Sequence, residues 1–349
     1  MEPMRRVALL FLTLTALACK DRQGAAPIGP ETATVPVLEA GRLEAYSEAF
    51  YGIIPRGARL EILAEGHDWT EGPLWVAQGG YLLYSDIPRN AVYKWAPAEG
   101  SQVYLQPSGF SGTDFKGEEP GSNGLLLDPE GRLVLCQHGN RQVARMRAAL
   151  DNPAPEFETL AASYQGKRLN SPNDAVYDRQ GNLYFTDPPY GLPGQMQDPG
   201  KELDFQGVYR LSREGELTLL TRELSRPNGL ALSPDEQRLY VANSDPEAAY
   251  WVVFDRLADG TLGPGERLFD ATDRTASEKG LPDGMKVHDK GYVFGTGPGG
   301  IYVFGPDGAL LGRILTGEAT SNCAFNEEQT ALFITADAYV LKLDLLPLN

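Results

Sequence analysis

The sequence predicts an all-β protein, a six-bladed β-propeller whose four-stranded antiparallel blades surround a central channel. A unit with a polar residue, an apolar run, a polar turn and a second alternating strand recurs six times. The copies are spaced by 39 to 55 residues, close to the length of a propeller blade. The 349 residues include 39 Gly and 26 Pro, which is typical of short strands joined by many turns. No helical repeat period is visible, so a closed ring explains the copies better than a capped solenoid does.

Each copy begins with one polar residue, which we call the marker residue. The six marker residues are Glu71, Asn123, Asn173, Asn228, Asp283 and Asn322. The second strands of the units are expected at residues 81–86, 133–136, 183–187, 239–243, 292–295 and 332–336. Residues 58–64 alternate in polarity before the first copy, and we expect them to pair with the last blade and close the ring.

The composition excludes several classes of protein. The hydrophobic content of 42% and charged content of 22% are those of a folded globular chain. The net charge of −16 would repel a phosphate backbone, so we expect no nucleic-acid partner. Three Cys and three His are too few for a disulfide framework or a usual zinc site. Cys136 and Cys323 lie in predicted strands and are interpreted as buried small residues.

The N-terminus predicts export. Basic residues are followed by an apolar run over 7–17 that is too short to span a bilayer but suits a signal peptide, predicted over 1–18. The run ends at Cys19 in a sequence similar to a bacterial lipobox, which predicts lipidation of Cys19; ordinary cleavage near Ala18 is the alternative. Residues 19–45 are predicted to be a flexible tether and 46–349 the propeller domain. We therefore expect a periplasmic monomer that contacts a membrane only through a lipid anchor.

The marker residues predict a cation site. In a propeller the innermost strands line the channel, so all six side chains would offer an oxygen toward the axis. Two carboxylates among four amides suit a hard divalent cation, and Ca²⁺ fits best, with Mg²⁺, Mn²⁺ or Zn²⁺ as alternatives. Asn-Gly and Asp-Gly are also ordinary turn dipeptides. Turn chemistry alone does not explain a polar residue at the same place in all six units.

Six motifs stand out along the chain: EGPLW at 71–75, LNSPND at 169–174, TDPPYG at 186–191, RPNG at 226–229, LPDGM at 281–285 and GPGG at 297–300. Together they resemble the gluconolactonase and regucalcin (senescence marker protein) family over nearly the whole chain from about residue 58. The resemblance implies a six-bladed propeller with a calcium-type ion. It implies that Glu71, Asn228 and Asp283 are metal ligands, that Asn173 is a fourth ligand or a substrate contact, and that Asp283 is the general base. The same four residues also resemble the set in diisopropylfluorophosphatase, a phosphotriesterase.

The expected substrate contacts are less uniform. Regucalcin-like members carry an Arg two residues before the position of Asn173, where this chain has Ser171. Arg168 is a candidate substitute, with a plain surface role as its alternative. Tyr190, in the loop after the third repeat's second strand, and His138 are further candidates, although a purely structural hydrogen bond suits His138 equally well.

These residues predict a metal-dependent hydrolase that opens the ester ring of a small sugar lactone. The ion would polarise the carbonyl and acidify water, and Asp283 would take the proton; direct attack by the Asp283 carboxylate is the alternative route. A phosphotriesterase, an esterase acting on other lactones, and a non-catalytic binding lipoprotein are the competing functions. The glycine-rich run 295–300 leads into a predicted strand and not a helix, so it is interpreted as a hairpin turn and not a nucleotide site.

Overall fold

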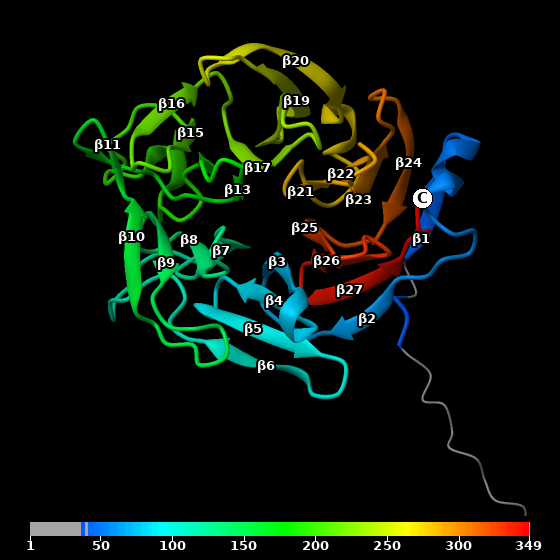
Figure 1. Cartoon of the computed structure of the whole chain (residues 1–349), viewed down its shortest axis with the longest axis horizontal. Coiled ribbons are helices and arrows are strands. Elements are labelled where there is room, and N and C mark those ends of the chain that lie inside the picture. Colours follow the sequence, from blue (N-terminus) through cyan, green and yellow to red (C-terminus); the bar gives the residue numbers. More distant parts are fainter. Residues whose placement is uncertain (1–35, 39–40, 349) are drawn as a thin grey trace, which may run out of the picture. The chain divides into compact units, whose positions relative to one another are not determined.

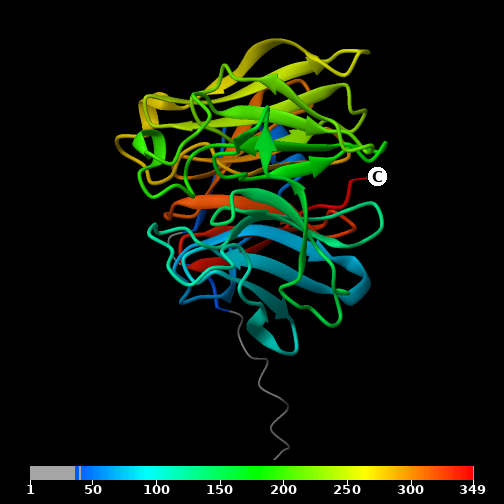
Figure 2. The same ribbon diagram turned by 90° about the vertical axis from the view of Figure 1, so that its left-hand side faces the viewer.

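The computed structural model describes residues 36–38 and 41–348, so the predicted signal peptide and Cys19 lie outside the described residues. Residues 42–344 contain 27 β-strands and four short 3₁₀ helices. Figure 1 shows the strands gathered into six sheets around a central axis, and Figure 2 shows the same ring from the side. The predicted six-bladed propeller is confirmed. No helix in the described part of the chain is long and apolar enough to cross a bilayer.

The first three blades follow the chain in order, from the innermost strand outward. Blade one contains β3 (Thr70–Val76), β4 (Tyr81–Asp86), β5 (Ala91–Ala96) and β6 (Gly100–Leu105). Blade two contains β7 (Ser122–Leu127), β8 (Leu133–Gln137), β9 (Gln142–Met146) and β10 (Phe157–Ala161). Blade three contains β13 (Ala175–Tyr177), β14 (Leu183–Asp187), β15 (Gly207–Leu211) and β16 (Leu217–Thr221). The separate hairpin β11 (Ser163–Tyr164) and β12 (Lys167–Arg168) lies between blades two and three along the chain.

The other three blades repeat this arrangement, and two of them add a strand from the N-terminal region. Blade four contains β17 (Pro227–Leu232), β18 (Arg238–Asp245), β19 (Ala248–Arg256) and β20 (Leu262–Asp270). Blade five contains β21 (Met285–Val287), β22 (Val293–Gly297), β23 (Gly300–Phe304), β24 (Leu310–Leu315) and β1 (Arg42–Ala45). Blade six contains β25 (Thr320–Phe325), β26 (Ala331–Ala336), β27 (Tyr339–Asp344) and β2 (Glu61–Ala64). The 3₁₀ helices are η1 (Glu48–Gly52), η2 (Ala77–Gly79), η3 (Gln195–Gln197) and η4 (Thr272–Arg274).

The predicted closure of the ring is confirmed. β2 pairs antiparallel with β27, with Glu61 opposite Lys342, so one strand from the start of the fold completes the last blade. Figure 1 shows these two strands, blue and red, side by side. Closing the ring in this way covers the sheet edges that two unpaired terminal strands would expose.

The structure differs from the sequence prediction at the end of the predicted tether. Residues 42–45 form β1, which pairs with β24 along the outer edge of blade five. The buried Arg313 binds Glu44 through two of its nitrogens, at 2.6 and 2.8 Å. The end of the region described as tether is therefore part of the folded body: Arg42–Ala45 form a strand, and before it Pro36 O accepts from Ile62 N at 2.8 Å and Leu38 N donates to Leu60 O at 2.9 Å. A four-residue edge strand is too short for its alternation to stand out from the Pro- and Ala-rich sequence before it.

Hydrophobic clusters fill the spaces between neighbouring sheets. Trp251 of blade four packs with Tyr302 and Phe304 of blade five, at ring-centroid distances of 4.8 and 5.7 Å. Cys136 and Cys323 are fully buried free thiols in β8 and β25, as predicted. The run 295–300 joins β22 to β23, which confirms the hairpin. Val, Ile, Tyr and Phe suit these strands because both faces of a sheet in the ring are packed against neighbouring sheets.

The innermost strands are irregular at the marker residues. In blades one, two, four and six the pairing register shifts between residues 71 and 74, 122 and 125, 227 and 230, and 320 and 322. In blades three and five the inner strand begins only after the marker residue, at Ala175 and Met285. Such irregularities re-aim a side chain out of the regular alternation of a strand.

A glycine after four of the markers lets the blades approach closely at the axis. A Cβ at Gly72 would lie 2.2 Å from the carbonyl oxygen of Asn123, and one at Gly229 would lie 2.2 Å from that of Asp283. A Cβ at Gly124 would lie 2.8 Å from the carbonyl oxygen of Asn173, and one at Gly284 would collide with the side-chain amide of Asn322. Any larger residue would push neighbouring blades apart. The glycine in the recurring dipeptide therefore serves blade packing, while the polar residue before it is free for another purpose.

Candidate functional site

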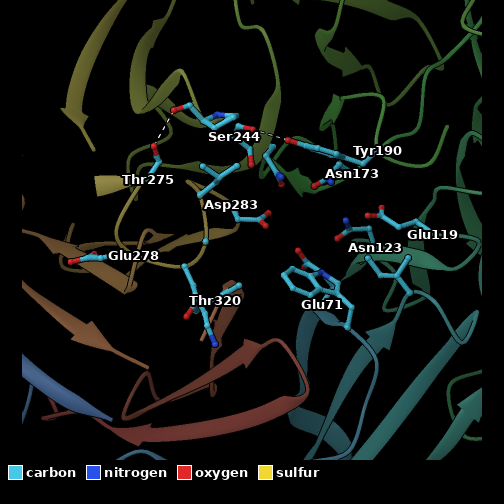
Figure 3. Close-up of a pocket in the computed structure, with 18 residues that line it drawn as sticks. Glu71, Glu119, Asn123, Asn173, Tyr190, Ser244, Thr275, Glu278, Asp283 and Thr320 are labelled. Atoms are coloured by element: carbon cyan, nitrogen blue, oxygen red, sulfur yellow. Dashed lines mark hydrogen bonds between the residues drawn. The ribbon is translucent and has the colours of Figure 1, made fainter. Parts of the chain in front are cut away.

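A cavity of about 500 Å³ opens at the axis of the propeller. Five of the six marker residues line it: Glu71, Asn123, Asn173, Asn228 and Asp283. Figure 3 shows the carboxyl groups of Glu71 and Asp283 and the amides of Asn123 and Asn173 directed into one space. The sixth marker, Asn322, lies beside Glu71 and is absent from the lining. The structure therefore brings together all four residues predicted as cation ligands.

The amide oxygens in the cavity have no partner. Asn123, Asn173 and Asn228 are each at least 97% buried, and their Oδ1 atoms form no hydrogen bond with the residues described; the same is true of Asp283 Oδ1. Buried polar atoms are normally paired, since an unpaired one costs about 1–3 kcal/mol. Four unpaired acceptors aimed at one cavity are accordingly the arrangement expected of a site for a cation.

The surroundings of Glu71 and Asp283 disfavour the ionised forms of their carboxyl groups. Burial raises the pKa of Glu71 to about 8, and the nearby Asp174 charge adds to this, although Glu71 Oε2 accepts from Gly72 N at 2.6 Å and from Asn322 Nδ2 at 3.2 Å. Burial also raises the pKa of Asp283 well above its ordinary value, and the charge of Glu71 adds to the effect. A cation between these groups would relieve both the burial and the repulsion.

The donor set suits a hard cation. In the part of the chain that the structure describes, no three His, Cys, Asp or Glu side chains cluster as a metal site. A cation in this cavity would therefore depend on the amide oxygens of Asn173 and Asn228 in addition to Glu71 and Asp283. Oxygen-only coordination with few carboxylates fits Ca²⁺ or Mg²⁺ better than Zn²⁺.

The predicted substrate residues divide into two groups. Tyr190 lines the cavity, and its hydroxyl donates to the carbonyl of Ser244 at 2.8 Å, which fixes the ring. Ser171 is fully buried, donates to the carbonyl of Pro188 and accepts from Gly191 N, so its hydroxyl serves the loop that carries Tyr190. Arg168 lies in β12, where its backbone N donates to Glu202. Arg168 and Ser171 do not line the cavity.

His138 also lies outside the lining but contacts a residue within it. Its imidazole is fully buried, and Nδ1 lies 2.8 Å from Oε2 of Glu119. Glu119 lines the cavity, as do Trp69, Ile87 and Glu278. The sequence reasoning did not single out these four residues because they stand in loops outside the repeated unit. The one available signal was the Glu-Pro-Gly sequence at 119–121, immediately before the second marker's strand.

The chain matches known proteins over almost its full length. Residues 69–338 match the model of the SMP-30/Gluconolactonase/LRE-like region. The gluconolactonase of Zymomonas mobilis is 38% identical over 342 residues, covering 96% of this chain and 92% of that protein. A solved gluconolactonase from Xanthomonas campestris aligns with a TM-score of 0.76 and 32% identity, over 90% of this chain and 98% of that one.

A more distant solved structure agrees in fold. Regucalcin of Agrobacterium tumefaciens aligns with a TM-score of 0.63 at 17% identity, over 82% of this chain and 94% of that one. The matched region of 69–338 includes the marker residues of all six blades and the whole cavity described above. The chain therefore belongs to the SMP-30/gluconolactonase/LRE-like family, as its motifs predict.

Proposed function

We propose that the protein is a cation-dependent lactonase that opens the ester ring of a sugar lactone. The observation that carries the proposal is the set of three unpartnered amide oxygens beside the carboxyl groups of Glu71 and Asp283 in one cavity. The relationship to gluconolactonases supports the choice of a lactone as the substrate. The cavity volume of about 500 Å³ is ample for a six-membered sugar ring.

The residues of this chain divide the work. Glu71, Asn173, Asn228 and Asp283 would hold a divalent cation, Ca²⁺ before Mg²⁺, Mn²⁺ or Zn²⁺. When bound, such an ion supplies Lewis acidity to the lactone carbonyl and to the attacking water. Asp283 accepts the proton of that water as general base, since its carboxyl group faces the cavity. Tyr190, fixed through Ser244, forms part of the wall against which the ring packs.

The segment before the fold completes the proposal. The sequence of residues 1–19 supports export to the periplasm and lipidation at Cys19. Metabolic labelling with a fatty acid, compared between the wild type and Cys19→Ala, tests this part separately. Label that persists in the variant would refute the anchor and leave the enzymatic proposal unaffected.

The hydrolysis of glucono-1,5-lactone, followed as acid release in a weakly buffered solution, tests the enzymatic function. We expect turnover that disappears with a chelator and returns with Ca²⁺, and that is lost in Asp283→Asn. Asp255→Asn, on an exposed Asp of blade four, is the matched control and should keep full activity. A phosphotriester assayed in parallel tests the competing substrate class. A purified, folded protein that hydrolyses no lactone would refute the proposal.

The role of Asp283 has its own test. A general base leaves the enzyme covalently unmodified, whereas nucleophilic attack links the substrate to the carboxylate. Acid quenching during turnover followed by intact-mass measurement distinguishes the two routes. A mass increase equal to one lactone would overturn the general-base assignment.

A further inference from the structure

Glu119 is one of two acidic residues, with Glu278, that line the cavity from loops outside the repeated marker positions. It lies in the loop between β6 and β7, and Figure 3 shows its carboxyl group facing the same space as Asn123 and Asn173. The loop is closed on itself by the hydrogen bond from Phe110 N to the carbonyl of Pro120, at 2.7 Å. Gly121 is fixed to the first blade through the carbonyl of Ile87, at 3.0 Å. The backbone that carries Glu119 is thus held in place.

The side chain of Glu119 is held by His138. The imidazole is fully buried, and Nδ1 donates to Oε2 of Glu119 at 2.8 Å. The backbone N–H of His138 donates to the carbonyl of Gly121, which holds this segment in place. Gly191 packs closely against it, since a Cβ added at Gly191 would lie only 2.7 Å from the Cβ of His138. In the described part of the chain, Oε1 of Glu119 has no hydrogen-bond partner. One oxygen therefore anchors the carboxylate while the other remains free at the cavity.

The other acidic residue on the rim is arranged differently. Glu278 also lines the cavity, but its carboxylate binds the guanidinium of Arg313 at 2.6 Å. The basic residue on the rim, Lys279, forms an ion pair with Glu318 at 2.6 Å. Glu119 is thus the rim carboxylate without a strongly basic partner. Its free oxygen can accept hydrogen bonds from a ligand that brings neutral donors.

We infer that Glu119, oriented by His138, accepts hydrogen bonds from the hydroxyl groups of the substrate and makes the site selective for polyhydroxylated lactones. This inference rests on the proposed function, because it concerns the same cavity. A sugar lactone presents several O–H donors next to its ring, whereas its carbonyl and ring oxygen only accept. A site built to bind a hydroxyl rejects the analogue without it, because the bound analogue keeps water from the acceptor and leaves it unpaired.

The alternative role for Glu119 is that of a cation ligand. Two observations favour the substrate role. One of its oxygens is already used by His138, and the residue does not come from the repeated position that supplies the other oxygens. A ligand role predicts lost Ca²⁺ affinity on substitution, and a substrate role predicts lost discrimination between lactones. The two roles are therefore separable by experiment.

The test compares glucono-1,5-lactone with δ-valerolactone, which has the same ring without hydroxyl groups. In Glu119→Ala we expect kcat/KM for the sugar lactone to fall about 10- to 100-fold, as for the loss of a hydrogen bond to a charged group, with that for δ-valerolactone little changed. Glu119→Gln keeps the shape and should fall in between. Glu118→Ala, on the exposed neighbouring residue, is the matched control and should match the wild type for both substrates.

The positioning role of His138 requires a separate readout. His138→Leu should raise KM for the sugar lactone more than it lowers kcat, and His138→Gln, which keeps an N–H donor, should recover part of the loss. Calorimetric titration with Ca²⁺ should give the same affinity for Glu119→Gln as for the wild type. Since Glu119 is partly exposed and its variants should fold, they decide the matter even where a His138 variant does not.

The outcomes are distinct. Equal losses on both lactones, or a large loss of Ca²⁺ affinity in Glu119→Gln, would overturn the role of Glu119 while leaving the lactonase proposal standing. A wild-type protein that turns over neither lactone would refute both. An unchanged kcat/KM for both lactones in Glu119→Ala would likewise overturn the role of Glu119.

Discussion

Two sets of polar residues meet at the axis, and the fold treats them in opposite ways. The set that lines the cavity includes Asn123, Asn173 and Asn228, whose side-chain oxygens have no partner. The second set, Asn322, Asp174 and Lys286, lies outside the lining; its members are paired with one another and with Oε2 of Glu71, whose side chain reaches from the cavity wall. Asn322 Nδ2 donates to Glu71 Oε2 at 3.2 Å and to Asp174 Oδ2 at 3.3 Å.

A lysine completes the second set. Lys286 Nζ donates to the carbonyl of Met285 at 3.0 Å and lies 4.0 Å from Asp174 Oδ2. The groups that hold blades one, three, five and six together are therefore satisfied by one another, and the groups facing the cavity are left for a ligand. A pattern of satisfied and unsatisfied polar atoms distinguishes structural from functional residues even when both occupy the same place in a repeat.

The largest effect that this contrast predicts is on catalysis. Asp283→Asn should lower kcat for lactone hydrolysis by a factor of about 10² to 10⁴, the usual contribution of a general base. Thermal stability in chelator should hold or rise, because the substitution removes a charge that burial disfavours. Steady-state kinetics and a melting curve check the two parts. A variant that loses activity only by unfolding would break the contrast between the two sets.

The next effect is stabilisation by the cation. At a Ca²⁺ concentration 100 times its Kd, binding to the folded state alone should add about 2.7 kcal/mol to the free energy of unfolding. Glu71→Gln should abolish most of this gain, and the exposed Asp255→Asn should keep it. Melting curves with chelator and with Ca²⁺ measure the difference. An equal gain in all three proteins would place the ion elsewhere.

A third prediction compares the two sets directly through matched substitutions. Asn322→Leu should lower the free energy of unfolding by about 1–3 kcal/mol in chelator, because it removes the amide group that donates to Glu71 Oε2 and to Asp174 Oδ2. Asn123→Leu removes no side-chain hydrogen bond found among the described residues and should cost little or stabilise. Urea denaturation of both variants provides the measurement. Equal costs would contradict the division into structural and ligand-binding residues.

The last prediction concerns pH. The pKa of Glu71 is about 8 in the folded state against an ordinary value of 4.5, so the folded state retains a proton that the unfolded chain releases. Its contribution to stability is present below about pH 4.5 and is lost as the pH rises through 8. In chelator, the melting temperature of the wild type should therefore fall more steeply over this range than that of Glu71→Gln. Identical slopes would contradict the raised pKa.

The sequence was sufficient to predict the fold and the centre of the site because both follow from the repeat. A polar residue at the same place in six units must face the axis of a ring, whichever blade carries it, so Glu71 and Asp283 could be placed together before any coordinates. The pairing of residues 61–64 with the last blade followed from the same logic. Residues 42–45 escaped prediction because an added edge strand leaves no periodic signal.

The surroundings of the site could not be predicted in the same way. Glu119 stands in a loop whose course depends on long-range hydrogen bonds, such as that from Gly121 N to Ile87. Arg168, Ser171 and Asn173 are close in sequence. Their spacing does not predict which of the three side chains reaches the cavity. The carboxylate of Asp187 accepts hydrogen bonds from the backbone N–H groups of Asn170 and Ser171. These bonds fix the local backbone, and the Ser171 side chain bonds within the neighbouring loop and does not reach the cavity.

The strand that closes the ring also governs how the chain can fold. Glu61 and Lys342 are 281 positions apart, so the contact that joins the two ends forms between the earliest and the latest parts of the propeller to be synthesised. Contacts of such long range slow folding, because the entropy of closing the intervening chain is lost before the pairing energy is gained. During synthesis, the edge of β2 that pairs with β27 stays unpaired until β27 itself has been made. A chain truncated before β27 would keep most of its blades, but its ring would stay open. The unpaired edge of β2 would then be exposed and could pair with another chain.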